Sequence, residues 1–237
     1  MIDRRRFIGL GGATLGAVSL GLAGCNSKGP ESARGMLRYA ERKNETLERA
    51  LLRHTSMDAP ESSRLAGRAL PSYFISERVP VWDEAARGAW TLEVTGAVRR
   101  PLWLTLEQLA ALPSIEQRVN HYCVEGWTAV VEYRGVRVSR LAQLAGILPD
   151  AGYVDFQSFD EDYHESWDLE SATHPQTIIA YASSDRYLTP AYGAPARLHS
   201  PVKLGYKSMK YLTRIVFMPE RNGGYWSDRG YEWYAGT

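Results

Sequence analysis

The chain has 237 residues, a formal net charge of +1 and 44% hydrophobic residues, including seven Trp and fourteen Tyr. This composition supplies enough apolar side chains for the core of one large domain or two small ones, which excludes a disordered chain. The charge shows no basic excess, so we do not expect a nucleic-acid-binding protein.

The first 25 residues are typical of a targeting segment rather than of a folded domain. Three arginines at positions 4–6 precede an uncharged run at positions 7–24 that contains six glycines. Two adjacent arginines ahead of such a run resemble the twin-arginine export signal, which serves proteins exported in folded form. The alternative is an uncleaved membrane anchor, because about 18 uncharged residues approach the length that spans a bilayer.

Cys25 ends the sequence Leu-Ala-Gly-Cys, which resembles the lipobox of bacterial lipoproteins. We therefore expect cleavage before Cys25, acylation of its thiol, and a periplasmic protein held at the membrane by the lipid. An acyl chain supplies membrane affinity without a spanning helix. Cys123 is then the single thiol of the mature chain, and an exported protein that keeps one central cysteine commonly uses it for chemistry or metal binding.

Residues 34–54 are predicted to form an amphipathic helix, because apolar residues such as Leu37, Ala40 and Leu47 recur at three- and four-residue spacing. Such a helix either lies on the domain or binds a partner. Residues 55–71 are rich in Ser, Pro, Ala and Gly and predict a loop. We divide the chain into a signal segment at residues 1–25, a tether with the amphipathic helix at 26–71, and one folded domain at 72–237.

From residue 79 onward, short predicted strands alternate with short helices, which favours an α+β fold with mixed sheets. Thr105 and Gln108 have the spacing of a capping box at the start of a helix, and Ser139 is predicted to cap another. The consecutive acids at 160–162 predict a solvated loop. The predicted strands cover residues 90–94, 130–138, 153–159, 177–182, 196–199 and 214–218, and the predicted helices begin at 105, 139 and 168.

Cys123 lies at the end of a predicted strand and is followed by Glu125, Gly126 and Trp127. The residues alone leave three interpretations open: a buried structural cysteine, a nucleophile activated by a histidine, or a thiolate ligand of a metal. The sequence lacks CxxC, HExxH and paired histidines at the spacing of zinc ligands, so a metal held by one thiolate would need a cofactor to complete its coordination. The histidines that could activate the thiol are His121, His164, His174 and His199.

Three separated motifs give a more specific signal. They are Cys-Val-Glu-Gly-Trp at 123–127, Gly-Ala-Pro-Ala-Arg at 193–197 and Gly-Tyr-Lys-Ser-Met-Lys at 205–210. In this order they resemble the sulfite oxidase family of molybdopterin enzymes, and most of all its exported bacterial branch, that of the protein-methionine-sulfoxide reductases. The resemblance covers roughly residues 72–234 and implies a sulfite-oxidase-type molybdopterin-binding fold.

The resemblance implies a Mo-molybdopterin cofactor and assigns roles to particular residues. Cys123 would be the sole protein ligand of molybdenum beside two dithiolene sulfurs, since a soft thiolate completes a sulfur-rich plane. Arg197 would hold the pterin phosphate with its planar donor fork. Lys207 would lie in an anion-binding pocket. The remaining cofactor contacts would come from Phe74, Ser76, Glu77, Ser158, Tyr192, Ser208, Met209 and Lys210.

His121 is a further candidate catalytic residue, because it is two positions before Cys123 and so points to the same face of the strand. It could donate to a metal-bound or substrate oxygen, or it could be an ordinary core or surface histidine. Aromatic residues at 225–234 either cover the mouth of the site or pack as a tail. Tyr192 stands where family members often carry Asn or His, and Ser76-Glu77-Arg78 stands where sulfite oxidases carry Arg-Asn-His. The context of the substrate tyrosine of sulfite oxidases is not evident here, so sulfite is not the expected substrate.

The sequence thus predicts an exported oxidoreductase that moves an oxygen atom in a two-electron step. Its substrate would be small or protein-borne, either sulfoxide-like or an oxyanion, and its electrons would be exchanged with a separate cytochrome or membrane haem protein. Two alternatives remain: a cysteine-dependent hydrolase that uses Cys123, and a non-catalytic binding lipoprotein that kept the fold without the metal.

Overall fold

The computed structural model describes residues 31–51, 70–160 and 162–237. Residues 1–51 and 52–237 form two compact units. The first contains helix α2 (Glu31–Leu51), which overlaps the helix predicted at 34–54 and exposes Leu37, Leu47 and Leu51. The predicted signal segment, Cys25 and most of the predicted loop at 55–71 lie outside the described residues.

No helix within the described ranges has both the length and the apolar character of a membrane span.

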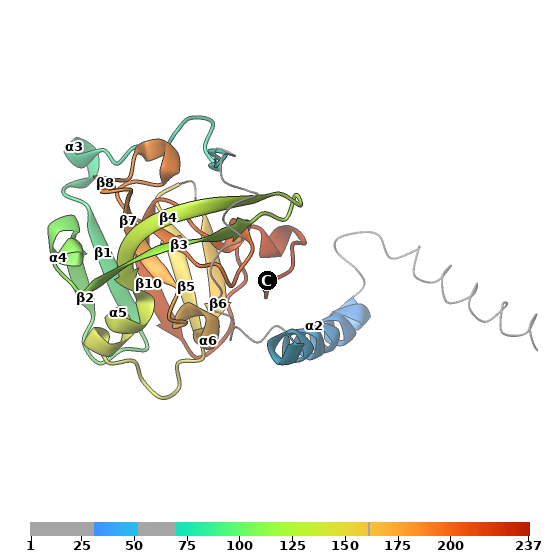
Figure 1. The fold of residues 1–237 in the computed structure, drawn as a ribbon. Coiled ribbons are helices and arrows are strands. Elements are labelled where there is room, and N and C mark those ends of the chain that lie inside the picture. The colour runs from blue at the N-terminus through green and yellow to red at the C-terminus, as the bar shows by residue number, and fades with distance from the viewer. Residues whose placement is uncertain (1–30, 52–69, 161) are drawn as a thin grey trace, which may run out of the picture. The chain divides into compact units, whose positions relative to one another are not determined.

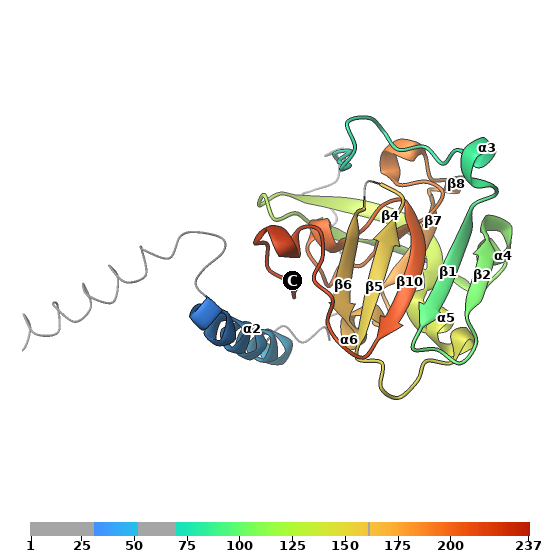
Figure 2. The same cartoon turned by 180° about the vertical axis from the view of Figure 1, so that it is seen from behind.

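Two sheets form the second unit, and Figure 2 shows the first of them face-on. In this sheet β1 and β10 run parallel, whereas every other neighbouring pair is antiparallel. Its strands stand in the order β2 (Leu102–Thr105), β1 (Thr91–Gly96), β10 (Leu212–Met218), β5 (Tyr153–Ser158) and β6 (His164–Asp168).

The second sheet contains a long hairpin, and its strands pair antiparallel. Its order is β3 (Ser114–Tyr122), β4 (Thr128–Arg137), β7 (Ile178–Ser183) and β8 (Arg186–Tyr187), with β9 (Arg197–His199) also paired to β7. The helices are α3 (Glu84–Arg87), α4 (Leu106–Ala110), α5 (Val138–Ala145) and α6 (Leu169–Ala172), with 3₁₀ turns η1 (Pro190–Tyr192), η2 (Gly205–Lys207) and η3 (Ser227–Arg229). The predicted α+β class is confirmed.

The main core lies where α4 and α5 meet both sheets. β1 buries alternate residues, Leu92 and Val94, as a strand with one face toward a core should. These side chains share the main apolar cluster with Leu109 of α4 and Leu141 of α5. A smaller cluster, with Val131 and neighbours, packs elsewhere on the second sheet. Residues of β4, β7 and β9 pack in these clusters, and β4 and β9 lead into the site.

Local signals predicted the starts of α4 and α6 correctly and the start of α5 wrongly. The capping box of α4 is present, with the Gln108 N–H donating to Thr105 Oγ1 (3.2 Å) and the Thr105 N–H donating to Gln108 Oε1 (2.9 Å). Ser139 is not a cap. Helix α5 begins at Val138, and Arg137 occupies the cap position without a side-chain bond, because β4 continues directly into the helix and the Val138 N–H bonds to Thr177 O (3.1 Å).

Candidate active site

Strands β3 and β4 form a hairpin (Figure 1). Cys123 follows the last residue of β3 and begins the turn. The Cys123 N–H donates to Trp127 O (2.9 Å), and the Gly126 N–H donates to Cys123 O (3.0 Å). Gly126 has φ +82°, a left-handed conformation that favours glycine because it has no Cβ. The turn therefore fixes the backbone of Cys123 while leaving its side chain half-buried.

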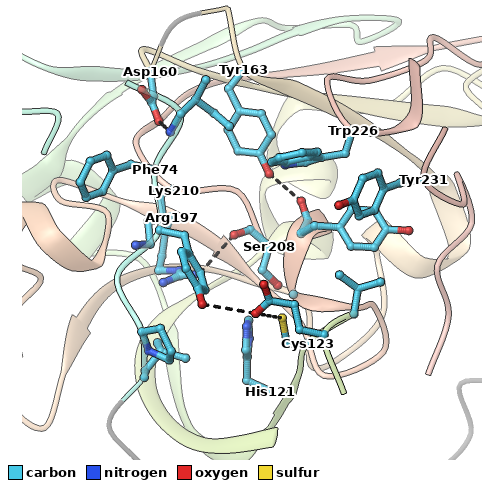
Figure 3. Close-up of a pocket in the computed structure, with 18 of the residues that line it drawn as sticks. Phe74, His121, Cys123, Asp160, Tyr163, Arg197, Ser208, Lys210, Trp226 and Tyr231 are labelled. Atoms are coloured by element: carbon cyan, nitrogen blue, oxygen red, sulfur yellow. Dashed lines mark hydrogen bonds between the residues drawn. The ribbon is translucent and has the colours of Figure 1, made fainter. Parts of the chain in front are cut away.

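A cavity of about 310 Å³ opens beside the thiol. Six of the residues predicted from the sequence line it: Phe74, His121, Cys123, Arg197, Ser208 and Lys210. In Figure 3, Phe74, Arg197 and Lys210 lie on one side of Cys123, and Trp226 and Tyr231 lie on the other. The cavity thus has a cationic end and an aromatic end, with the thiol between them.

Glu125 is the hydrogen-bond partner of the thiol within the described residues. Its Oε2 lies 3.8 Å from Cys123 Sγ and also accepts from Trp127 Nε1 (2.9 Å) and Tyr73 OH (3.3 Å). Burial, with a contribution from the Glu125 carboxylate, raises the pKa of Cys123 above its usual value. A cysteine nucleophile is activated by a lowered pKa or by an adjacent base. Among the described residues, the thiol contacts a carboxylate rather than a histidine, which gives no support to the histidine-activated hydrolase.

The cationic end is built around Arg197 of β9, which is 2% exposed. Its guanidinium donates to Tyr133 OH (3.1 Å), Tyr192 O (3.2 Å) and Ser208 O (3.1 Å). Beside it, Lys210 Nζ donates to Ala191 O (2.8 Å). Burial, with a smaller effect of the Arg197 cation, lowers the pKa of Lys210 to about 7, so an anionic group bound here would restore its charge.

His121 and His199 form a buried, stacked pair beneath the cavity. His121 Nδ1 lies 3.4 Å from His199 Nε2, and the ring centroids are 5.5 Å apart. Burial, followed by the charges of Arg197 and Lys210, lowers the pKa of His121 to about 3, so its imidazole is neutral at ordinary pH. A Cβ on Gly205 would lie 2.6 Å from His121 Nε2, so glycine at 205 makes room for this ring.

The position of Lys207 does not fit the predicted anion-binding role. Its side chain is fully buried and outside the lining of the cavity, and its ammonium donates to Glu165 Oε2 at 2.7 Å. A cation held by a carboxylate in the interior cannot also meet an anion in the cavity. No local pattern could indicate this pairing, because Glu165 lies in strand β6, which was not predicted.

Five other predicted cofactor contacts lie outside the cavity lining. Ser76 donates to Asp160, Glu77 is exposed, and Ser158 Oγ accepts from the Asp160 N–H (2.9 Å). Tyr192 contributes its carbonyl to Arg197 rather than its ring to the cavity. Met209 is fully buried in the main core.

Asp160 lines the cavity, although the sequence pattern did not single it out. It was predicted to be solvated, but it is 1% exposed. Its carboxylate accepts from Ile75 N (2.7 Å) and Ser76 N (2.9 Å) and from the Ser76 hydroxyl. This contact holds the segment that places Phe74 at the cavity, and a run of three acids gives no means to single out the buried one.

Comparisons with known proteins identify the family of the chain. Residues 77–226 match the oxidoreductase molybdopterin binding domain. The chain belongs to this family. It is therefore a molybdopterin oxidoreductase, as the three sequence motifs predicted.

Two relatives of the molybdopterin oxidoreductase are bacterial. It is 35% identical over 226 residues to the putative protein-methionine-sulfoxide reductase subunit YedZ1 of Azospira oryzae, covering 94% of this chain and 84% of that protein. It is 31% identical over 154 residues to the protein-methionine-sulfoxide reductase catalytic subunit MsrP of Campylobacter jejuni, covering 58% of this chain and 52% of that protein. The chain thus spans about half of that second relative.

Among solved structures, the sulfane dehydrogenase SoxCD from Paracoccus pantotrophus has a similar fold. The TM-score is 0.52 at 23% sequence identity, over 55% of this chain and 38% of that one. At this identity the likeness concerns the fold, and it confirms the predicted sulfite-oxidase type.

Mo-molybdopterin is the cofactor of the oxidoreductase, and the donors of the cavity fit it. Three buried polar atoms on lining residues have no hydrogen-bond partner within the described residues: Arg197 Nε, Ser208 Oγ and Tyr211 OH. Buried polar groups are almost always paired, so these atoms call for a polar ligand. Together with the two cations and one thiol, they suit a phosphate-bearing pterin whose metal needs a soft protein ligand.

Proposed function

We propose that the protein reduces methionine sulfoxide to methionine, on peptides or proteins. The observation that carries this proposal is the division of the cavity, with both lining cations at one end and Trp226 and Tyr231 at the other. Arg197 and Lys210 would hold the pterin phosphate, and Cys123 would ligate the molybdenum. The aromatic end is then left for the substrate.

A sulfoxide suits this end better than an oxyanion does. The methionine sulfoxide side chain is neutral, with apolar groups on both sides of the sulfur, and such groups pack well against aromatic rings. Lys207, the cation predicted for an oxyanion substrate, is instead paired with Glu165. The names of the two relatives point to the same substrate.

The reaction takes two electrons and two protons: the S=O bond breaks, the oxygen leaves as water, and the sulfoxide becomes a thioether. When bound, the molybdenum cofactor supplies the two-electron exchange of the oxygen atom. The chain's own residues orient the sulfoxide against the aromatic wall and hold the cofactor at its phosphate end. We propose that electrons arrive singly from a separate redox protein, a cytochrome or membrane haem protein, consistent with the word subunit in the relatives' names.

We expect the purified, molybdenum-loaded protein to oxidise a reduced viologen dye when a peptide containing methionine sulfoxide is added. Two dye molecules should be consumed for each methionine formed, as measured by absorbance and mass spectrometry. The same peptide with unoxidised methionine is the control. A loaded protein that leaves the sulfoxide peptide intact while dye remains reduced would refute the proposed substrate.

We further propose that the chain is exported through the twin-arginine route and held at the periplasmic face of the membrane by a lipid on Cys25. The support is the sequence of residues 1–25 and the need to insert a bulky cofactor before export.

Replacing Arg4 and Arg5 with lysine should leave the precursor in the cytoplasm, and Cys25→Ala should give a protein without the lipid. Fractionation and mass spectrometry of the N-terminus measure both effects. Arg99 and Arg100 replaced by lysine serve as the matched control. Membrane localisation of both signal variants would instead indicate a plain hydrophobic anchor.

A further inference from the structure

A buried ion pair lies behind the aromatic end of the cavity. Lys207 Nζ and Glu165 Oε2 are 2.7 Å apart, and both side chains are fully buried. Replacing such a pair by apolar residues of similar volume is often neutral for stability, because the pair must be removed from water. Stability of the fold therefore gives no sufficient reason for a charged pair at this place.

Glu165 holds the segment that forms the aromatic wall. Its Oε1 accepts from the Trp226 N–H (2.7 Å), and its Oε2 accepts from Ser227 Oγ (3.0 Å). The segment passes directly against the carboxylate: a Cβ on Gly224 would lie 2.3 Å from Glu165 Oε2. The backbone that carries the Trp226 ring is thus anchored to one buried side chain.

Lys207 connects Glu165 to Ser208, a residue that lines the cavity. Its ammonium also donates to Ser166 O (3.1 Å) and Ser227 Oγ (3.4 Å). Lys207 ends the η2 turn, and the next residue, Ser208, lines the cavity and accepts from Arg197 through its carbonyl. The pair therefore joins the Trp226 segment at the aromatic end of the cavity to the Ser208 segment at its cationic end.

We propose that Glu165 and Lys207 are positioning residues, which fix the Trp226 wall relative to Ser208 and so set the width of the substrate end. Neither side chain touches the substrate. The kinetic part of this inference rests on the proposed sulfoxide substrate. The structural part concerns the Trp226 backbone and can be measured without any substrate.

Two double variants of the full-length holoenzyme distinguish the effect of losing the hydrogen bond to the Trp226 N–H from the effect of losing the two charges. Glu165→Leu/Lys207→Met removes the pair and its acceptors, whereas Glu165→Gln/Lys207→Met removes the charges but keeps an acceptor for the Trp226 N–H. The Leu/Met variant should raise KM for the sulfoxide peptide by about tenfold, the factor that corresponds to about 1.4 kcal/mol of lost packing between the substrate and the Trp226 ring. Its kcat and molybdenum content should stay near the wild-type values, and its Trp226 amide should lose protection from hydrogen exchange. The Gln/Met variant should recover both KM and protection.

A second buried pair provides the control. Lys203 and Asp168 are 3.0 Å apart and 1% exposed, so Asp168→Asn/Lys203→Met makes a similar change in another place and should leave KM unchanged. The proposal is overturned if the Leu/Met variant keeps wild-type KM and Trp226 protection, if the Gln/Met variant is equally impaired, or if the control raises KM as much. If the wild-type protein reduces no sulfoxide, the proposed function fails, and the exchange of the Trp226 amide still decides the positioning role.

Discussion

Replacing Cys123 with serine is expected to abolish oxygen-atom transfer while leaving the fold intact. The side chain is half-buried in a turn that backbone hydrogen bonds define, so the exchange of sulfur for oxygen costs little stability. A hydroxyl is a harder and less acidic ligand than a thiol, and it cannot replace a soft thiolate at the metal. Since changes to the neighbours of metal ligands alone cost about 10- to 100-fold in activity, we expect a loss of more than about a hundredfold.

The variant should still contain pterin, because Arg197, Lys210 and Ser208 remain in place. Molybdenum and pterin content, the visible spectrum and the viologen assay together measure the effect. Retained pterin, a changed spectrum and lost activity are the expected set of results. Full activity of Cys123→Ser, or full activity of wild-type protein free of molybdenum, would contradict the role given to this thiol.

Replacing Arg197 with alanine should have the largest effect on cofactor retention. Charge-assisted hydrogen bonds contribute on the order of 1.5–3 kcal/mol each, and about 1.4 kcal/mol corresponds to a factor of ten. We therefore expect retention of molybdopterin to fall by roughly ten- to a hundredfold in dialysis of the purified protein. Arg197→Lys should recover part of it, because a point charge cannot make a planar two-point contact.

Arg134→Ala is the matched control for this change. Arg134 is a partly exposed arginine of β4 that pairs with Glu116 and Asp185, and it does not line the cavity. This variant should keep its pterin. Unchanged retention in Arg197→Ala, or equal loss in both alanine variants, would mean that the phosphate end is elsewhere.

Binding of molybdopterin by the cofactor-free protein should weaken as the pH rises above about 7. The pKa of Lys210 is lowered to about 7, so its ammonium is present below that pH and is lost above it. A bound phosphate favours the charged form, and affinity therefore falls until the pH reaches the higher pKa of Lys210 in the complex. Lys210→Met should remove most of this dependence.

Local patterns predicted the elements that depend on neighbouring residues. The capping box of α4 and the alternation of β1 involve contacts within a few positions or one repeating face, and both formed as expected. Strand β6 was missed because its residues Glu165, Ser166 and Asp168 are polar and yet buried. Their burial depends on Lys207, Trp233 and Lys203, partners that are distant in the sequence.

Some residues of the candidate site could likewise be predicted from the sequence, and others could not. Cys123, Arg197 and Lys210 belong to motifs whose order in the sequence could be recognised, and the fold brings them to one cavity. Lys207 belongs to the same motif as Lys210, but the direction of its side chain depends on the Glu165 carboxylate, more than 40 residues away in the sequence. Asp160 and Glu125 could be assigned to the site only from the hydrogen bonds that their carboxylates accept in the structure.

X-ray absorption at the molybdenum edge, measured on the wild-type protein and on Cys123→Ser, shows whether Cys123 is a ligand of the metal. We expect three sulfur neighbours at the wild-type metal, two from the pterin and one from Cys123, and two at the metal of the variant. The same sulfur count in both proteins would contradict the claim that Cys123 holds the metal.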